Sequence, residues 1–130
     1  RSQICEGYLK FYSKKMNLNI EVLSAGIKAE GVKTKAITTM LQDNIDISKH
    51  TSNVIEEYIS KPITHVITVC DHAFESCPVL LKKANFTHQN FKDPSKVVGD
   101  NAMIDKAFSI CREEIKKFTI AFLKTNFIND

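Results

Sequence analysis

Apolar side chains recur along this chain with two different periods, which predict helices alternating with strands. Apolar residues return every three or four positions, as on one face of a helix, over 4–16, 33–43, 52–59 and 101–123. The stretch "NIEVLSAG" alternates apolar and polar residues, and "THVITVC" is a β-branched run typical of a strand buried on both faces. This order predicts an α/β fold with a parallel sheet, whose ligand site lies at the carboxyl ends of the strands.

Composition and charge narrow the classes of protein that fit. With 130 residues, 43% of them hydrophobic, the chain predicts one domain over 1–130 with its own core. The net charge is only +3 and the basic residues are scattered, which argues against a nucleic-acid partner. No apolar run approaches the ~20 residues of a membrane span, and no signal-peptide pattern is seen. We therefore expect a cytoplasmic monomer without a membrane partner.

The four cysteines divide into two groups by position. In a reducing compartment, cysteines are more often buried, catalytic or metal-binding than paired in structural disulfides. Cys5 and Cys111 fall on the apolar faces of predicted helices, which favours core packing. Cys70 and Cys77 flank the segment after the β-branched strand, and their spacing is wider than the about two to four residues usual for zinc ligands. A metal site is therefore poorly supported.

The spacing of Cys70 and Cys77 sets a condition on any bond between them. If the segment between them is helical, a rise of ~1.5 Å per residue places the two Cα atoms ~10 Å apart. A disulfide needs a Cα separation of less than ~7 Å. The two cysteines are then either a redox switch that requires this segment to unwind or two small buried hydrophobic residues.

Five stretches in order carry a resemblance to a known family: "RSQICEG", "SAGIKAEGV", "IDISKHTS", "VITVCDHAFESCP" and "FKDPS". Together they resemble the thioredoxin-coupled arsenate reductases, which are built on the low-molecular-weight protein tyrosine phosphatase fold. The resemblance implies a three-layer α/β sandwich around a central parallel sheet of about four strands. The phosphatases share the phosphate-binding loop and the Asp-Pro but generally lack the cysteine pair, so the pair favours a reductase.

The resemblance also implies roles for individual residues. Arg1 and Ser2 match the end of a phosphate-binding loop that reads Cys, five residues, Arg, Ser, and would bind arsenate or phosphate. Asp93, before Pro94, matches the general acid. The cysteine that opens the loop motif would precede Arg1. We therefore expect that an N-terminal segment with the first strand and this nucleophile is missing from the sequence given, and that residues 1–130 alone are inactive.

In such reductases a cascade of three thiols would carry the oxidation, first the loop cysteine, then Cys70 and then Cys77. Thioredoxin or glutaredoxin would reduce the final disulfide and so regenerate the thiols. Some relatives also have a potassium site, whose ligands match Glu6, Ser24 and, with an amide in place of a carboxylate, Asn53. Simpler interpretations compete for two of these residues. Ser2 is also a common helix-capping residue, and Glu6 is also an acid favoured by the dipole of a first helical turn.

Two other functions stay open. A phosphatase would use Arg1 and Asp93 to hydrolyse a phosphomonoester without Cys70 or Cys77. A non-catalytic oxyanion-binding module would keep the anion affinity of Arg1 and show no turnover.

Overall fold

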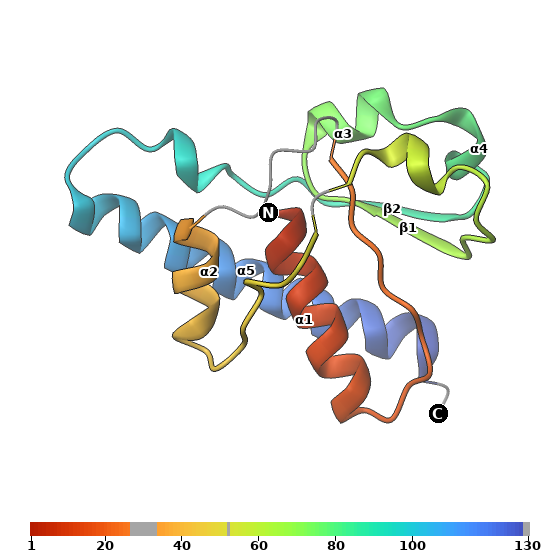
Figure 1. Cartoon of the computed structure of the whole chain (residues 1–130), viewed down its shortest axis with the longest axis horizontal. Coiled ribbons are helices and arrows are strands. Elements are labelled where there is room, and N and C mark those ends of the chain that lie inside the picture. Colours follow the sequence, from red (N-terminus) through yellow and green to blue (C-terminus); the bar gives the residue numbers. More distant parts are fainter. Residues whose placement is uncertain (27–33, 52, 129–130) are drawn as a thin grey trace.

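The computed structural model describes residues 1–26, 34–51 and 53–128. Its elements are the helices and strands α1 (Ser2–Lys15), α2 (Thr34–Leu41), β1 (His65–Thr68), α3 (Asp71–Ser76), α4 (Val79–Lys82), β2 (Asn85–His88) and α5 (Asn101–Phe127), with 3₁₀ helices at Ile55–Tyr58 and Pro94–Lys96. Figure 1 shows α1, α2 and α5 grouped together, with the two strands, α3 and α4 gathered at one side. Within the described residues, no helix has the length and apolar character needed to cross a bilayer.

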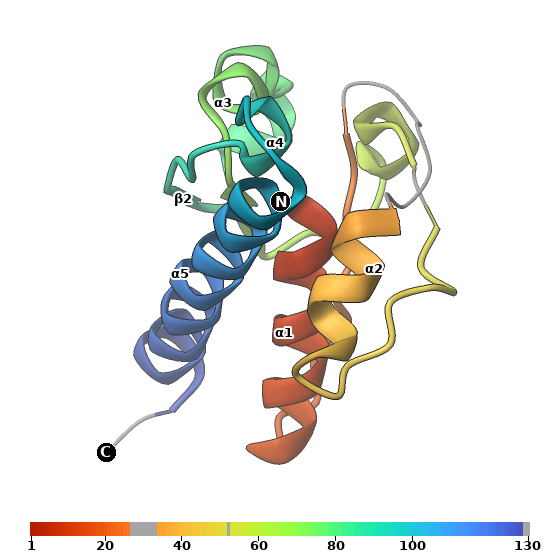
Figure 2. The ribbon, with the colours of Figure 1, turned by 90° about the vertical axis from the view of Figure 1, so that its left-hand side faces the viewer.

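The three longer helices form the frame of the molecule. In Figure 2, α1 lies between α2 and α5, and side chains from all three build the core. Tyr8, Met40 and Ile115 are completely buried there. Gly7 allows α1 to approach α2 closely, since a Cβ at this position would lie 2.8 Å from the Cε atom of Met40. The frame therefore depends on tight apolar contacts along one face of α1.

One polar group inside the frame ties the helices together. The Tyr8 hydroxyl donates a 2.8 Å hydrogen bond to Asp43, just after α2, and the Lys116 ammonium of α5 lies 3.1 Å from the same carboxylate. Burial would raise the pKa of Asp43, but these two partners hold it below its ordinary value. Asp43 is thus a charged carboxylate that links α1 to α5.

The two strands are parallel and are joined by α3 and α4. Their register pairs His65 with Asn85 at one end and Thr68 with His88 at the other. Parallel strands need such a crossover connection, and here it carries Cys70 and Cys77. A separate parallel bridge joins Gly26 to Val54. The carboxyl ends of β1 and β2 therefore meet beside the start of α3.

The predicted α/β class with a parallel sheet is confirmed, and so are the helices over 4–16, 33–43 and 101–123 and the strand in "THVITVC". The helix predicted over 52–59 is a 3₁₀ helix over Ile55–Tyr58, and residue 52 lies outside the described residues. Burial on both faces, predicted for "THVITVC", is wrong for most of this run: Thr68 and Val69 are buried, whereas His65, Val66 and Ile67 are only partly buried and line a cavity.

The prediction of a strand over "NIEVLSAG" is wrong for the described residues. A strand exists through hydrogen bonds to a neighbour, and in the part of the chain that the structure describes only Gly26 of this stretch forms a bridge. The described sheet accordingly has two strands where about four were expected.

Candidate active site

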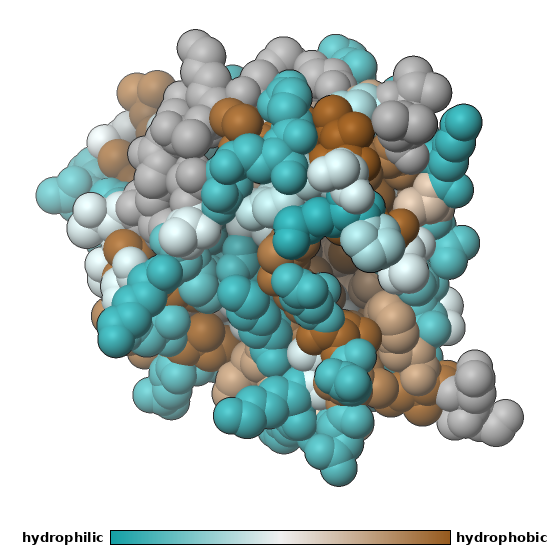
Figure 3. All heavy atoms as spheres, turned by 45° about the vertical axis from the view of Figure 1, so that its right-hand side comes forward, coloured by the Kyte–Doolittle hydropathy of each residue, from teal (hydrophilic) through white to brown (hydrophobic). Residues whose placement is uncertain are grey.

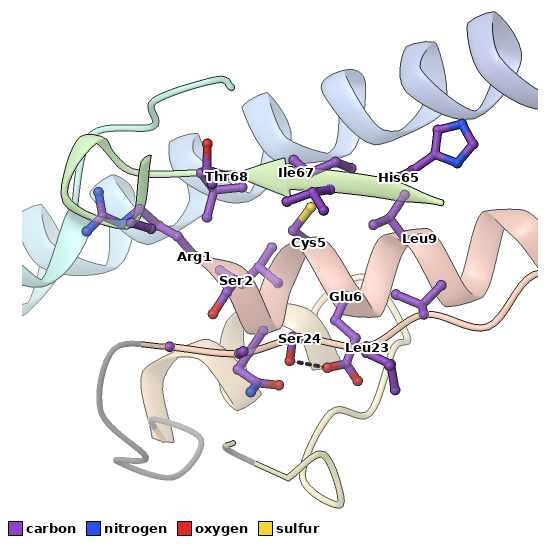
Figure 4. A pocket seen from close by; sticks show the side chains of 18 of the residues that line it. Arg1, Ser2, Cys5, Glu6, Leu9, Leu23, Ser24, His65, Ile67 and Thr68 are labelled. Carbon is purple, nitrogen blue, oxygen red and sulfur yellow. Dashed lines mark hydrogen bonds between the residues drawn. The ribbon is translucent and has the colours of Figure 1, made fainter. Parts of the chain in front are cut away.

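A cavity of about 930 Å³ lies between α1, β1 and the stretch before Gly26. Four residues predicted for catalysis or oxyanion binding line it, Arg1, Ser2, Cys70 and Asp93, and so do Glu6 and Ser24 of the predicted potassium set. Figure 4 shows Arg1 and Ser2 at the start of α1 and Thr68 at the end of β1, all at the same end of the cavity. On the face drawn in Figure 3, brown hydrophobic side chains lie within a hollow that hydrophilic residues border. Arg1, Ser2 and Thr68 therefore lie together at one end of a cavity that both apolar and polar side chains line.

Arg1 and Asp93 form the centre of this polar end. The Arg1 guanidinium donates a 2.7 Å hydrogen bond to the carbonyl of Phe91 and lies 3.3 Å from the Asp93 carboxylate. Asp93 begins the short 3₁₀ helix and accepts hydrogen bonds from the backbone and the hydroxyl of Ser95, at 3.0 and 2.7 Å. Both side chains of the ion pair are 22% exposed, so a small anion in water can reach them. The loop over 91–95 thus holds its carboxyl group against a cation at the start of α1.

Cys70 lies between β1 and α3 and acts as the N-cap of this helix. Its sulfur accepts a 3.4 Å hydrogen bond from the backbone N–H of Ala73, and the residue is half-buried. Cys77 directly follows α3 and is only 6% exposed. Burial raises the pKa of the Cys77 thiol, although Lys82 opposes this. The segment between the two thiols is helical, so a bond between Cys70 and Cys77 would require this segment to unwind. Both cysteines are free thiols.

The other two cysteines are core residues, as predicted. Cys5 of α1 is 5% exposed and Cys111 of α5 is 3% exposed, and both belong to the main hydrophobic cluster. Burial raises the pKa of Cys5 to about 12 and also raises that of Cys111. Neither thiol ionises readily at neutral pH.

Comparison with known proteins decides the family. The model of the family described as low molecular weight phosphotyrosine protein phosphatase matches residues 1–126. The chain belongs to this family. In this chain the end of β1 and the start of α1 lie at the same end of the cavity.

Several relatives of the chain are arsenate reductases by name. The arsenate reductase of Halalkalibacterium halodurans is 35% identical over 125 residues, covering 96% of this chain and 88% of that protein. Arsenate reductase 2 of Staphylococcus epidermidis is 41% identical over 95 residues, 73% of this chain and 70% of that protein. The resemblance found in the sequence is thereby confirmed.

Solved structures agree on the fold. An arsenate reductase in the phosphate binding state superposes with a TM-score of 0.79 and 25% identity, covering 95% of this chain and 88% of that one. The low molecular weight protein tyrosine phosphatase from T. tengcongensis has a TM-score of 0.77 and 21% identity, with 96% and 90% covered. The second likeness concerns the fold alone.

The residues expected to bind potassium have other partners in this member of the phosphatase family. Glu6 is 6% exposed, accepts a hydrogen bond from the Ser24 hydroxyl (Figure 4) and accepts a 2.6 Å hydrogen bond from the Lys10 ammonium. Asn53 uses its side-chain oxygen to accept a 2.7 Å hydrogen bond from Thr51. In this arrangement Lys10 supplies the positive charge beside Glu6, and the predicted set does not fit a potassium ion.

The alternative interpretation of Glu6 as a first-turn acid is wrong, because this residue lies in the second turn of α1 and is buried. His50 is a further neighbour, with its Nδ1 atom 3.3 Å from the carboxylate. Burial lowers the pKa of His50 even though Glu6 opposes this, which favours a neutral imidazole. The charge on Glu6 is therefore balanced by Lys10. In the described residues no three His, Cys, Asp or Glu side chains gather as metal ligands.

Sequence reasoning missed a cluster at the carboxyl ends of the two strands. His88, the last residue of β2, contacts Thr68 at 2.6 Å and Asp71 at 2.8 Å. The ring of Phe74, on α3, stacks on the imidazole with 4.6 Å between centroids. The signal was hard to find, because the four residues of β2 form no apolar run and the strand was not predicted.

Proposed function

We propose that this protein reduces arsenate to arsenite by thiol–disulfide exchange, with Cys70 and Cys77 as its second and third thiols. The observation that supports this most is that Arg1, Asp93 and Cys70 line one end of a single cavity, while a helix separates Cys70 from Cys77. Relatives at 35% and 41% identity are arsenate reductases by name, which agrees with the proposal.

Arg1 and Ser2 would bind the oxyanion. A guanidinium presents paired N–H donors that match two oxygens of a tetrahedral anion, and the free N–H groups at the start of α1 add further donors. Asp93 lies 3.3 Å from Arg1, so an anion bound by the guanidinium lies within reach of the carboxyl group. In its protonated form Asp93 would give its proton to the oxygen that leaves arsenic as water.

The electrons come from two thiols. The thiolate of the cysteine expected before Arg1 would displace the protonated oxygen and form a sulfur–arsenic bond. The Cys70 thiolate then attacks that sulfur: a disulfide forms, the sulfur–arsenic bond breaks, and arsenic keeps the electron pair and leaves as arsenite. The proton on Cys70 passes to water before this attack.

Cys77 completes the exchange. After losing its proton to water, its sulfur attacks Cys70, which releases the loop thiolate and leaves a Cys70–Cys77 disulfide. Because burial raises the pKa of Cys77, this step requires the thiol to leave its buried position, which unwinding of α3 would allow. A protein dithiol such as thioredoxin or glutaredoxin then reduces the disulfide. We propose that the protein acts in this cycle as a monomer.

The test is arsenite formation by the full-length polypeptide with a thioredoxin system. We expect Cys70→Ser to form no arsenite and Cys77→Ser to stop after a single turnover, with Cys70 held in a disulfide that mass spectrometry detects. Cys111→Ala is the matched control, because it removes a thiol from the core and is expected to keep full turnover. Multiple turnovers in either Cys70→Ser or Cys77→Ser would contradict the proposal.

A phosphatase is the second candidate, and membership of the phosphatase family favours it. The Arg1–Asp93 pair suits ester hydrolysis equally well, since a phosphomonoester needs an anion clamp and a general acid. The double variant Cys70→Ser/Cys77→Ser separates the two functions. Undiminished hydrolysis of p-nitrophenyl phosphate by this variant, together with no arsenite from the unaltered protein, would establish the phosphatase instead. Binding of phosphate without either reaction would indicate a non-catalytic module.

A further inference from the structure

The side chain of His88 contacts the Cys70–Cys77 segment and both strands of the sheet. This residue ends β2 and pairs in register with Thr68, the last residue of β1. Its Nδ1 atom lies 2.6 Å from the Thr68 hydroxyl, and its Nε2 atom lies 2.8 Å from the carboxylate of Asp71. A neutral imidazole satisfies both contacts when Nε2–H donates to Asp71 and Nδ1 accepts from Thr68. The imidazole therefore joins both strands to the first residue of α3.

The same imidazole also holds the middle of α3. The Phe74 ring stacks on it, 29° from parallel, with 4.6 Å between centroids. Phe74 also contacts the ring of Phe86 at 5.8 Å, and the Lys82 ammonium lies 5.3 Å from its centroid. Asp71 and Phe74 are three residues apart, so one face of α3 presents both to His88. A further contact comes from the backbone N–H of Asp71, which donates a 3.3 Å hydrogen bond to the side chain of Asn90, after β2.

These contacts are weak enough to break during turnover. The side chains of Asp71 and His88 are 69% and 23% exposed, and Phe74 is 40% exposed. Contacts between partly exposed side chains each make a modest contribution to stability. Six residues form too short a helix to persist without tertiary contacts. Whether α3 stays helical therefore depends largely on His88 and Phe74.

We infer that His88 and Phe74 form a latch that keeps α3 helical and the Cys70 and Cys77 thiols apart, so that releasing it permits the Cys70–Cys77 disulfide. The inference rests on the proposed roles of these two thiols and adds positioning residues to them. Phe74 must leave His88 when the segment between the cysteines shortens from the ~10 Å of a helix to the less than ~7 Å of a disulfide. The latch thereby limits how often Cys77 becomes available.

Alkylation of Cys77 in the reduced full-length protein measures this opening directly. Cys77 is 6% exposed and is alkylated only when its segment opens, so its rate follows the population of the open form. Losing the ring contact or the charged hydrogen bond should raise that rate about tenfold in Phe74→Ala and in His88→Gln. Mass spectrometry of iodoacetamide-treated protein assigns the label to each cysteine.

The chain offers matched controls. Phe74→Tyr keeps the ring and should leave the Cys77 rate unchanged. His65→Ala removes the histidine at the opposite end of the same strand pair, which contacts Phe122 and Phe127, and should also leave it unchanged. Cys5 and Cys111 report global unfolding in the same sample, because both are buried in the helical frame.

The inference is overturned if Cys77 labelling is unchanged in Phe74→Ala or His88→Gln, or if it rises only in step with Cys5 and Cys111. The measurement uses neither arsenate nor an oxidant. A protein that fails to reduce arsenate would therefore end the proposed function and leave the labelling result standing.

Discussion

The helical frame and the active edge of this molecule differ in how completely their side chains are buried. In the frame of α1, α2 and α5, Ile115 is completely buried and Cys5 is 5% exposed. At the active edge, which comprises β1, β2, α3 and the loop over 91–95, Phe74 is 40% exposed and Cys70 is half-buried. The frame gains its stability from apolar burial, whereas the edge buries fewer side chains, Phe91 and Thr68 among them, and depends more on polar and ring contacts.

This difference shows how one residue type acquires two roles. Burial raises the pKa of Cys5 to about 12, so that thiol is inert at neutral pH. Cys70 lies at the start of a short helix and at the edge of a cavity, where a substrate can reach its sulfur. The inferred opening of α3 requires a low local stability of this segment. Changes in the frame should therefore affect folding, and changes at the edge should affect chemistry.

Removing apolar volume from the frame should have the largest effect on stability. Ile115→Ala deletes three methyl or methylene groups from a completely buried position and should lower the free energy of unfolding by about 3 kcal/mol. Denaturant unfolding monitored by circular dichroism measures this loss. Ile110→Ala is the matched control on α5, since Ile110 is 50% exposed and should cost less than about 1 kcal/mol.

If Ile115→Ala and Ile110→Ala lower the free energy of unfolding by the same small amount, apolar burial is not what stabilises the frame. It is sharpened if phosphate affinity, measured near the temperature of maximum stability, is the same in Ile115→Ala as in the unaltered protein.

Changing the cation at the edge should have a smaller effect, confined to anion binding. Arg1→Lys keeps the charge but loses the planar fork that contacts both Phe91 and Asp93. We expect phosphate to bind about tenfold more weakly, because paired donors are replaced by a single ammonium. Isothermal titration calorimetry with the full-length polypeptide measures this affinity.

Arg112→Lys provides the control for that substitution. Arg112 is a frame residue that donates hydrogen bonds to the Thr39 carbonyl and to Gln42, so its replacement should change stability and not phosphate affinity. Equal losses of phosphate affinity in both variants would mean that Arg1 acts through folding and does not touch the anion.

The same contrast explains how much the sequence could predict. Helices α1 and α5 were predictable because long amphipathic segments repeat their period many times. Strand β2 has four residues and α3 has six, too few to show a period, so both depend on tertiary contacts that a sequence does not display. The stretch "NIEVLSAG" has a strand pattern, yet pairing also requires a neighbour.

The residues of the candidate site also differ in how far the sequence could predict them. Arg1, Cys70 and Asp93 were predicted through a resemblance and lie together in the structure. His88 was not predicted, because the residues that it contacts, Thr68 and Asp71, lie far from it in the sequence. Lys10 carried a readable signal, since it follows Glu6 at the i, i+4 spacing of a helical ion pair.

The ion pair of Lys10 with Glu6 gives the smallest expected effect, a change in stability with the cation in solution. The Lys10 ammonium lies 2.6 Å from the buried Glu6 carboxylate, and therefore potassium should stabilise the unaltered protein no more than sodium does at equal ionic strength. Lys10→Met leaves Glu6 without this cation, so potassium should stabilise the variant by about 1 kcal/mol more than sodium does, or by about 4 °C in Tm. Thermal unfolding in the two salts measures both cases. A shift with potassium in the unaltered protein would mean that Lys10 leaves the carboxylate to the metal, and Glu6, Ser24 and Asn53 would then be ligands as the sequence predicted. No shift in either protein would mean that Glu6 supports the fold through Ser24 and Lys10 alone.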